Sequence, residues 1–168
     1  PGERRHVLER AVMRRAALAI LLALPALAAP PSPSETFLRE YRPGSLSEAE
    51  RVRRIQILGT SGDPKAAEAL SKAFRMERNS AYLQAWILKT LCDQVGSAAA
   101  LKVVGQALKS RYTPRSVGLV AQRSLADVCA PEGMAWMATE GLKDPELREA
   151  MAWGLAWDAA FQDPGPFL

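Results

Sequence analysis

The feature that most constrains the fold of this chain is an internal repeat with a period of about 33 residues. In each copy an apolar segment ends at a leucine, Gly or Pro interrupts the chain, and a second apolar segment follows. A fixed period in this range is typical of arrays of stacked supersecondary units. The marker leucines are separated by 33, 34 and 30 residues and are Leu58, Leu91, Leu125 and Leu155.

The segments between the breaks have helical periodicity. Apolar residues recur three positions apart, as in Val52, Ile55 and Leu58, and β-branched residues do not alternate with polar ones over any useful length. Ser47 with Glu50 three residues later has the pattern of a capping box, which marks a helix start. Helices are expected over 35–42, 65–77, 97–110 and 131–143, each followed by a partner over 47–59, 80–95, 114–128 and 145–160.

These helix pairs predict an all-α fold, a right-handed α-solenoid of about four stacked antiparallel helical hairpins. One hairpin cannot bury its apolar face alone, whereas a stack of hairpins forms a continuous core. The composition agrees, since hydrophobic residues make up 48% of the chain but aromatic residues only 7%. Small apolar residues favour close helix contacts, and this apolar content excludes intrinsic disorder.

The N-terminal residues have the three parts of an export signal. Two arginines follow Met13, then comes an apolar run of about 13 residues, and residues 26–28 have the small-x-small pattern of a cleavage site. The run is short for a membrane-spanning helix, which needs about 20 apolar residues. We therefore expect cleavage after Ala28 and a periplasmic or secreted protein without stable membrane insertion. The alternatives are an uncleaved anchor or a helix of the fold.

Four segments follow from these patterns. Residues 1–12 are interpreted as an upstream extension and residues 13–28 as the signal peptide. Residues 29–44 hold a Pro/Ser-rich linker and a short first helix, and the repeat domain occupies 45–168. Residues 162–168 resemble another turn with the next helix just beginning. Either the array is truncated there, or its end packs on another surface.

One segment resembles the signature of the HEAT-repeat family. In residues 144–155, Asp144 and Arg148 flank the start of a second helix that continues with Ala150 and Leu155. The resemblance implies stacked hairpins whose second helices line a concave binding side. It also implies that Asp144 and Arg148 are structural and tie neighbouring hairpins together.

A second segment adds to this resemblance. Residues 58–64, followed by Ala66 and Leu70, resemble the turn and next helix of the bacterial, lyase-like branch of the family. The likeness covers roughly 45–168. Gln84 and Gly118 stand where the family has arginine, so the ladder of Asp and Arg is not expected in the second and third repeats.

Catalytic chemistry is not expected from this sequence. The only histidine is His6, upstream of the signal, so the exported part has none. Its absence excludes histidine-dependent nucleophilic catalysis and most zinc sites. No phosphate-binding glycine-rich motif is present in the sequence either. We interpret the chain as a non-enzyme with no cofactor and no metal.

Cys92 and Cys129 are expected to be two buried, free thiols in second helices of neighbouring repeats. Cys92 lies one residue after Leu91, whereas Cys129 lies four after Leu125. This difference corresponds to an offset of about 4.5 Å along the helix axis. Together with a helix spacing of about 8–10 Å, it strains the limit of about 7 Å between the Cα atoms of a disulfide.

The charge does not favour nucleic acid as a partner. The chain carries a formal charge of +4, but residues 1–28 contribute five arginines against two glutamates. The remaining residues hold 17 basic and 16 acidic side chains, a net charge of +1. Affinity for phosphate backbones needs many basic contacts on one face.

The second helices share a candidate binding face. The positions two and five residues before each marker leucine lie on one side of a helix, because they are three residues apart. Exposed tryptophan and arginine together are typical of binding hot spots. The alternative is that the tryptophans belong to the core or cover the end of the stack. The residues predicted to bind a partner are Arg53, Gln56, Trp86, Lys89, Arg123 and Trp153; Val120 and Ala150 complete the two columns.

Three functions are compatible with this reading. We favour a non-catalytic scaffold of the cell envelope that offers a concave helical groove to a protein or peptide. The first alternative is a protein similar to the lyase-like HEAT proteins, which attach bilins to substrate proteins or detach them. The substrate proteins of that branch are cytoplasmic, whereas this chain has an export signal. The second is DNA-lesion recognition, which needs a basic cleft that the near-neutral charge does not provide.

Overall fold

The structure of the chain is a computed structural model that describes residues 30–162, with side chains through Trp157. The described residues from Ser32 to Gln162 belong to one compact unit. Its described part holds eight α-helices and no strand, which confirms the predicted all-helical fold. They are α2 (Pro33–Glu40), α3 (Glu48–Gly59), α4 (Ala66–Met76), α5 (Ala81–Thr90), α6 (Ala98–Lys109), α7 (Arg115–Ala126), α8 (Pro131–Thr139) and α9 (Pro145–Gln162).

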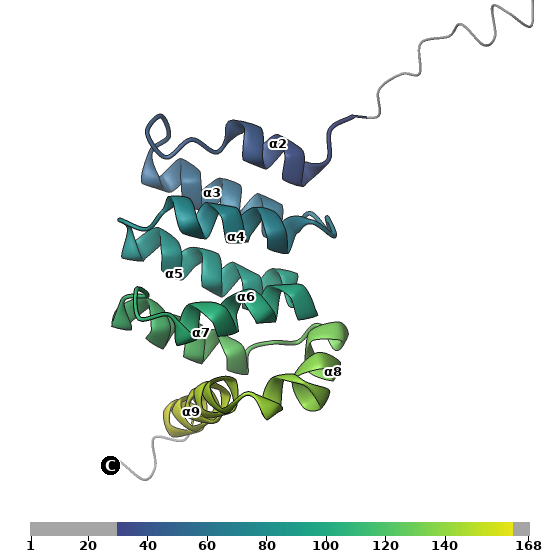
Figure 1. Cartoon of the computed structure of the whole chain (residues 1–168), viewed down its shortest axis with the longest axis vertical. Helices are drawn as coiled ribbons and strands as arrows, with labels where there is room; N and C mark the ends of the chain where they lie inside the picture. The colour runs from purple at the N-terminus through teal and green to yellow at the C-terminus, as the bar shows by residue number, and fades with distance from the viewer. Residues whose placement is uncertain (1–29, 163–168) are drawn as a thin grey trace, which may run out of the picture. The chain divides into compact units, whose positions relative to one another are not determined.

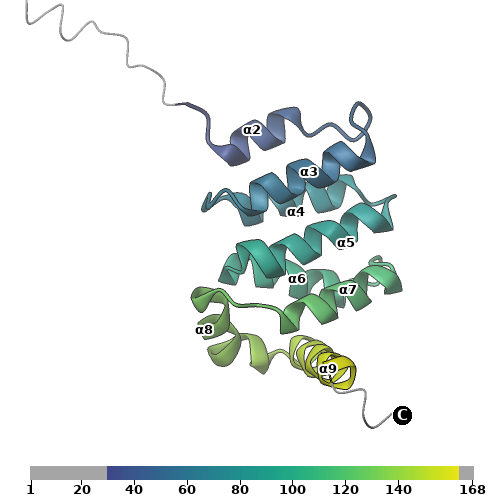
Figure 2. The same ribbon diagram turned by 180° about the vertical axis from the view of Figure 1, so that it is seen from behind.

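The helices pack in two layers (Figures 1 and 2). Helices α2, α4, α6 and α8 lie side by side in chain order in the first layer, and α3, α5, α7 and α9 do so in the second. Each first-layer helix is followed along the chain by one of the second layer. Helix α9 is drawn nearly end-on in both views, whereas α3 and α5 run across them, so its axis is turned relative to theirs.

All eight predicted helices are present, and the differences lie at their ends. Helix α5 continues into a π-helical turn, Leu91–Val95, which ends at Gly96 with a φ of +54°. Helix α8 stops at Thr139 instead of 143 and is followed by a 3-10 turn, Gly141–Lys143. A Cβ at Gly141 would lie 2.6 Å from the Met137 sulfur, so a larger residue there would displace the Met137 side chain.

Serine side chains set the helix starts. The Oγ atoms of Ser47, Ser80 and Ser97 each accept a hydrogen bond from the backbone N–H three residues later. At Ser47 this is the only half of the predicted capping box that forms. The complete box lies at Ser32 and Glu35 and starts α2, which packs against α3 and α4. Helix α2 is therefore part of the same compact unit as the repeats.

The prediction for the N-terminal signal peptide, residues 13–28, lies outside the described residues. Within the described part, no helix has both the length and the apolar character that crossing a membrane requires.

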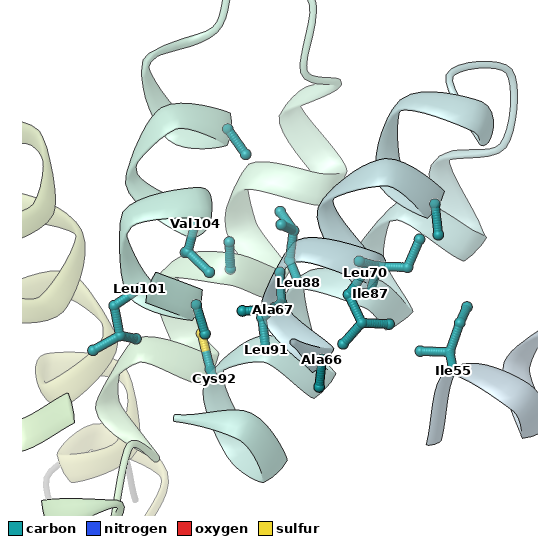
Figure 3. Close-up of a cluster of buried hydrophobic side chains, with 14 of the residues drawn as sticks. Ile55, Ala66, Ala67, Leu70, Ile87, Leu88, Leu91, Cys92, Leu101 and Val104 are labelled. Atoms are coloured by element: carbon teal, nitrogen blue, oxygen red, sulfur yellow. The ribbon is translucent and has the colours of Figure 1, made fainter. Parts of the chain in front are cut away.

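The core lies between the two layers (Figure 3). Leu70 from α4, Ile87 from α5 and Leu101 from α6 are fully buried in one cluster. The same apolar core extends from Phe37 in α2 to Ala150 in α9. Each described hairpin therefore shares its apolar surface with its neighbours.

The marker leucines behave alike in three repeats and differently in the fourth. Leu58, Leu91 and Leu125 are at most 2% exposed, whereas Leu155 is 51% exposed. Leu155 therefore marks the repeat in the sequence but does not belong to the core. Helix α9 is the last described helix and buries Leu147, Ala150 and Gly154 instead. The side of α9 that carries Leu155 has no described hairpin over it.

A buried polar cluster links the first two hairpins. Glu77 at the end of α4 is 3% exposed and accepts hydrogen bonds from the Tyr41 hydroxyl (2.8 Å) and from Arg51 Nη1 (2.7 and 2.8 Å). Burial first, and then the hydrogen bond to Glu77, raise the pKa of Tyr41 above its ordinary value. Phe37 stacks on the Tyr41 ring at 4.7 Å. The carboxylate thus joins residues of α3 and α4 to the end of α2.

At the position where the HEAT-repeat family has arginine, the residue has different surroundings in each of the four repeats. Arg51 pairs with the buried carboxylate of the first link, and Gln84 is buried with its amide donating to the Phe74 carbonyl at 3.5 Å. Gly118 leaves open space, since a Cβ there would meet no atom within 4 Å. Arg148 is exposed on α9. The contact between hairpins that the resemblance implies for Arg148 is therefore made in the first repeat, by the equivalent residue Arg51.

Asp144 has an interhairpin contact of its own. Its carboxylate accepts a hydrogen bond from the ammonium of Lys109 at the end of α6, and this contact lowers the pKa of Asp144. The backbone N–H of Leu147 also donates to it at 3.5 Å. Asp144 therefore ties α9 to the preceding hairpin, as the resemblance implies.

Two of the helical glycines, Gly118 and Gly154, should respond oppositely to substitution by alanine. Gly118→Ala is expected to raise the free energy of unfolding by about 0.5–1 kcal/mol, because alanine favours the helix and its Cβ meets open space. Gly154→Ala is expected to lower it by about 1–3 kcal/mol, because its Cβ would lie 2.4 Å from the Gln122 carbonyl oxygen. Denaturant unfolding followed by circular dichroism measures both. A destabilising Gly118→Ala or a neutral Gly154→Ala contradicts the described packing.

In the Glu77 cluster, substitution of the carboxylate and substitution of the Tyr41 hydroxyl should lower the free energy of unfolding by different amounts. Glu77→Gln should lower the free energy of unfolding by about 3 kcal/mol, because it leaves the Arg51 charge buried without a counter-charge. Tyr41→Phe should cost about 1 kcal/mol, because only one hydrogen bond is lost and the stacked ring remains. The same unfolding experiment compares them. Equal costs would show that the charge pair is not the dominant interaction.

Candidate binding face

The candidate site is the exposed side of α3, α5, α7 and α9, here called the second-layer face. On α3, Arg53 is exposed and lies 3.9 Å from Glu50, and Gln56 is half-buried. On α5, Trp86 is half-buried, and the half-buried Lys89 pairs with Asp93 four residues later. These four predicted residues therefore reach the surface on two adjacent helices.

The remaining predicted residues lie on the next two helices. Arg123 on α7 is exposed. Trp153 on α9 is 37% exposed, and its ring stacks on that of Trp157 at 5.1 Å. Of the other column positions, Val120 is half-buried, but Ala150 is only 2% exposed and belongs to the core. The column through Ala150 thus does not reach the surface on α9, because the turned helix buries that side.

Three further apolar residues of this face were not predicted. Ile57 on α3, Tyr82 on α5 and Leu119 on α7 are 57%, 54% and 42% exposed. The Tyr82 ring packs edge-on against Trp86 at 6.4 Å. Each lies four residues from a predicted position, at Arg53, Trp86 or Arg123, so helical spacing was the signal that could have found them.

A cleft of about 330 Å³ opens where the α6–α7 loop, α7 and α9 meet. Its apolar lining includes Leu108, Leu119 and Trp153. Arg115 is the one charged residue among those that line it, and Gly118 also lines it. The structure thus brings Trp153 together with Leu119 and Arg115. No contact is described that joins Trp153 to Arg53 or Trp86.

A second cleft, of about 480 Å³, lies between residues 59–66 and 94–99. Its two carboxylates already cap neighbouring helices. Asp63 accepts from the backbone N–H groups of Lys65 and Ser34, both at 2.8 Å, and these bonds lower its pKa. Glu132 accepts from the backbone N–H of Ala98 at 3.3 Å. The acidic groups of this cleft therefore have structural roles.

The cysteines are free thiols, as predicted, but only one is buried. Cys92 lies in the π-helical turn and is 1% exposed. Cys129 is exposed, lies beyond the end of α7, and donates to the Asp127 carbonyl at 3.1 Å. The prediction of a second buried, helical thiol is wrong, because the helix ends at Ala126. In the part of the chain that the structure describes, no group of three or more His, Cys, Asp or Glu side chains could hold a metal ion.

Comparison of the chain with protein-family models, with curated proteins and with solved structures gave no match. The proposal for its function therefore rests on the geometry and chemistry of the second-layer face.

The two thiols should differ strongly in reactivity. Iodoacetamide is expected to modify Cys129 rapidly in the native chain and Cys92 only after unfolding. Burial raises the pKa of the Cys92 thiol above its ordinary value, and the thiolate is the reactive form. Mass spectrometry of the labelled chain measures the two rates, and Cys129→Ser should abolish the rapid phase. Equal rates at the two sites contradict the described burial.

Proposed function

We propose that this protein is a non-catalytic scaffold of the cell envelope that binds a protein or peptide partner on its second-layer face. Its architecture on this proposal is a right-handed, HEAT-like α-solenoid. The alternation of helices between two layers and the repeat of about 33 residues support that architecture. So does the link from Arg51 in one hairpin to Glu77 in the next.

The observation that carries the proposal is a series of exposed apolar side chains on four consecutive second-layer helices. Ile57, Tyr82, Leu119 and Trp153 lie on α3, α5, α7 and α9 respectively, and each is at least 37% exposed. Single exposed apolar residues are normal, whereas contiguous patches of them mark interaction surfaces. Leu119 and Trp153 line one cleft, and Tyr82 packs against Trp86, so parts of this series are contiguous. Their neighbours on the same helices include Arg53 and Arg123, and arginine and aromatic residues are enriched at binding hot spots.

Rigid helices favour binding at this face. The exposed side chains stand on helices whose opposite sides belong to the shared core, with Ile55, Ile87 and Val117 fully buried. Side chains on a preorganised backbone lose less conformational freedom on binding than those of a mobile loop. A partner that spans several helices would therefore meet an ordered surface.

The proposal predicts that substitutions on the face weaken partner binding and leave folding intact. Peptides selected from a random displayed library on the full chain should bind Trp86→Ala and Arg123→Glu about tenfold or more weakly, which is the size of a hot-spot effect. Fluorescence anisotropy with the labelled peptides measures the affinities. Circular dichroism and thermal melting verify that each variant is folded.

Matched controls lie in the first layer. Met134→Ala removes an apolar side chain that is 55% exposed on α8, and Arg75→Glu reverses an exposed charge on α4. Both should bind the selected peptides as tightly as the parent chain. Unfolding of Trp86→Ala would support the alternative in which this tryptophan belongs to the core. Equal effects of the face and control substitutions would overturn the proposal.

A further inference from the structure

We propose that the cleft beside Gly118 is the anchor pocket of this binding face, and that it takes a large apolar side chain with a carboxylate next to it in the sequence of a peptide partner. The inference rests on the proposed function and specifies the partner that this face would recognise. It depends on three features of the cleft: its size and lining, the open space at Gly118, and its unbalanced positive charge.

The cleft is large enough to hold one large side chain. Its volume of about 330 Å³ is at the lower end of the range of about 300–1,000 Å³ found for small-molecule sites. Leu108, Leu119 and Trp153 provide an apolar wall, and Thr113 and Gln122 provide polar groups. The lining is therefore mixed, and polar groups beside an apolar wall can hold a ligand in one orientation.

Gly118 keeps this cleft open. A glycine inside a helix is unfavourable unless the packing needs it. Gly154 is needed, because a Cβ there would lie 2.4 Å from the Gln122 backbone carbonyl oxygen, whereas a Cβ at Gly105 would contact the Leu147 side chain tightly at 3.0 Å. A Cβ at Gly118 would meet nothing within 4 Å. The consequence of glycine at this position is therefore free space on α7, where the family resemblance implies a long arginine side chain.

The charge of the lining favours an anion. The residues that line the cleft, all of them described, include Arg115 and no Asp or Glu. The nearby ammonium of Lys109 is already paired with Asp144. Helix α7 begins at Arg115, and its N-cap, Pro114, has no side-chain cap, so the partial positive charge of this helix end adds to that of Arg115. A carboxylate next to the apolar side chain of the peptide would therefore meet both the Arg115 charge and the partial positive charge of the helix end.

A peptide fits the surroundings of the cleft better than an isolated small molecule. Leu119 and Trp153 line the cleft and are also 42% and 37% exposed, so the apolar surface continues out of it. Arg123 is exposed on α7, four residues after Leu119. A segment whose anchor enters the cleft can therefore extend along α7 over the second-layer face.

Three short peptides test the chemistry of the pocket. The probes are Phe flanked on each side by two Glu, the same peptide with Lys in place of Glu, and the Glu peptide with Ala in place of Phe. Each is titrated to millimolar concentration into the full chain labelled with ¹⁵N, and amide and indole shifts are followed. The Glu–Phe peptide should shift the amides of 115–122 and the indole of Trp153, and should bind at least tenfold more tightly than the other two. Absence of this localised shift, or equal binding of the three peptides, overturns the proposal.

Substitutions on α7 distinguish a blocked cleft from an unfolded chain. Gly118→Leu should fill the cleft and weaken the Glu–Phe peptide at least tenfold, whereas Gly118→Ala should have little effect. Ser116→Leu adds the same side chain at an exposed position outside the lining and is the matched control. Arg115→Gln should remove most of the preference for Glu over Lys. Unchanged binding to a folded Gly118→Leu chain overturns the pocket.

The same variants distinguish this inference from the proposed function. Among the peptides selected on the full chain, loss of binding in Trp86→Ala but not in Gly118→Leu refutes the pocket and leaves the binding face in place. Loss in Gly118→Leu but not in Trp86→Ala or Arg123→Glu supports the pocket and refutes the wider face. Loss in all of them supports both.

Discussion

Burial of apolar surface between neighbouring hairpins is the interaction on which the described fold depends, because a single helical hairpin has no core of its own. Leu58, Leu91 and Leu125 occupy equivalent positions in successive second-layer helices, and each is almost fully buried. One apolar core connects residues from α2 to α9. Polar contacts follow this arrangement: the Glu77 cluster and the pair of Lys109 with Asp144 both join consecutive hairpins.

In this arrangement the residues of the second-layer face do not contribute to the apolar core. Tyr82 and Leu119 are exposed although their helices are well buried on the other side. The glycines show how the packing changes toward α9. Gly154 allows α9 to approach the α7 backbone closely, whereas Gly118, eight residues before the last residue of α7, Ala126, leaves room for a cleft between them. Binding at this face would therefore not compete with the contacts that maintain the fold.

The helices and much of the face could be predicted from the sequence because their determinants are local. The repeat period, the capping serines and the prolines depend only on neighbouring residues, and they placed all eight described helices close to their observed positions. Helical spacing also placed Arg53, Trp86, Arg123 and Trp153 on surface positions. The unbonded state of the cysteines was also predicted, although the argument for it placed Cys129 in a helix and this residue lies beyond the end of α7.

The sequence by itself thus determined which residues form helices and which side of each helix is apolar. Only the tertiary structure decided what covers each side, because burial depends on residues far apart in the chain. Glu77 is a core residue only because Tyr41 and Arg51 reach it from other helices. Leu155 is exposed because α9 is turned onto another of its sides. The cleft at Gly118 likewise exists only where three separate segments meet.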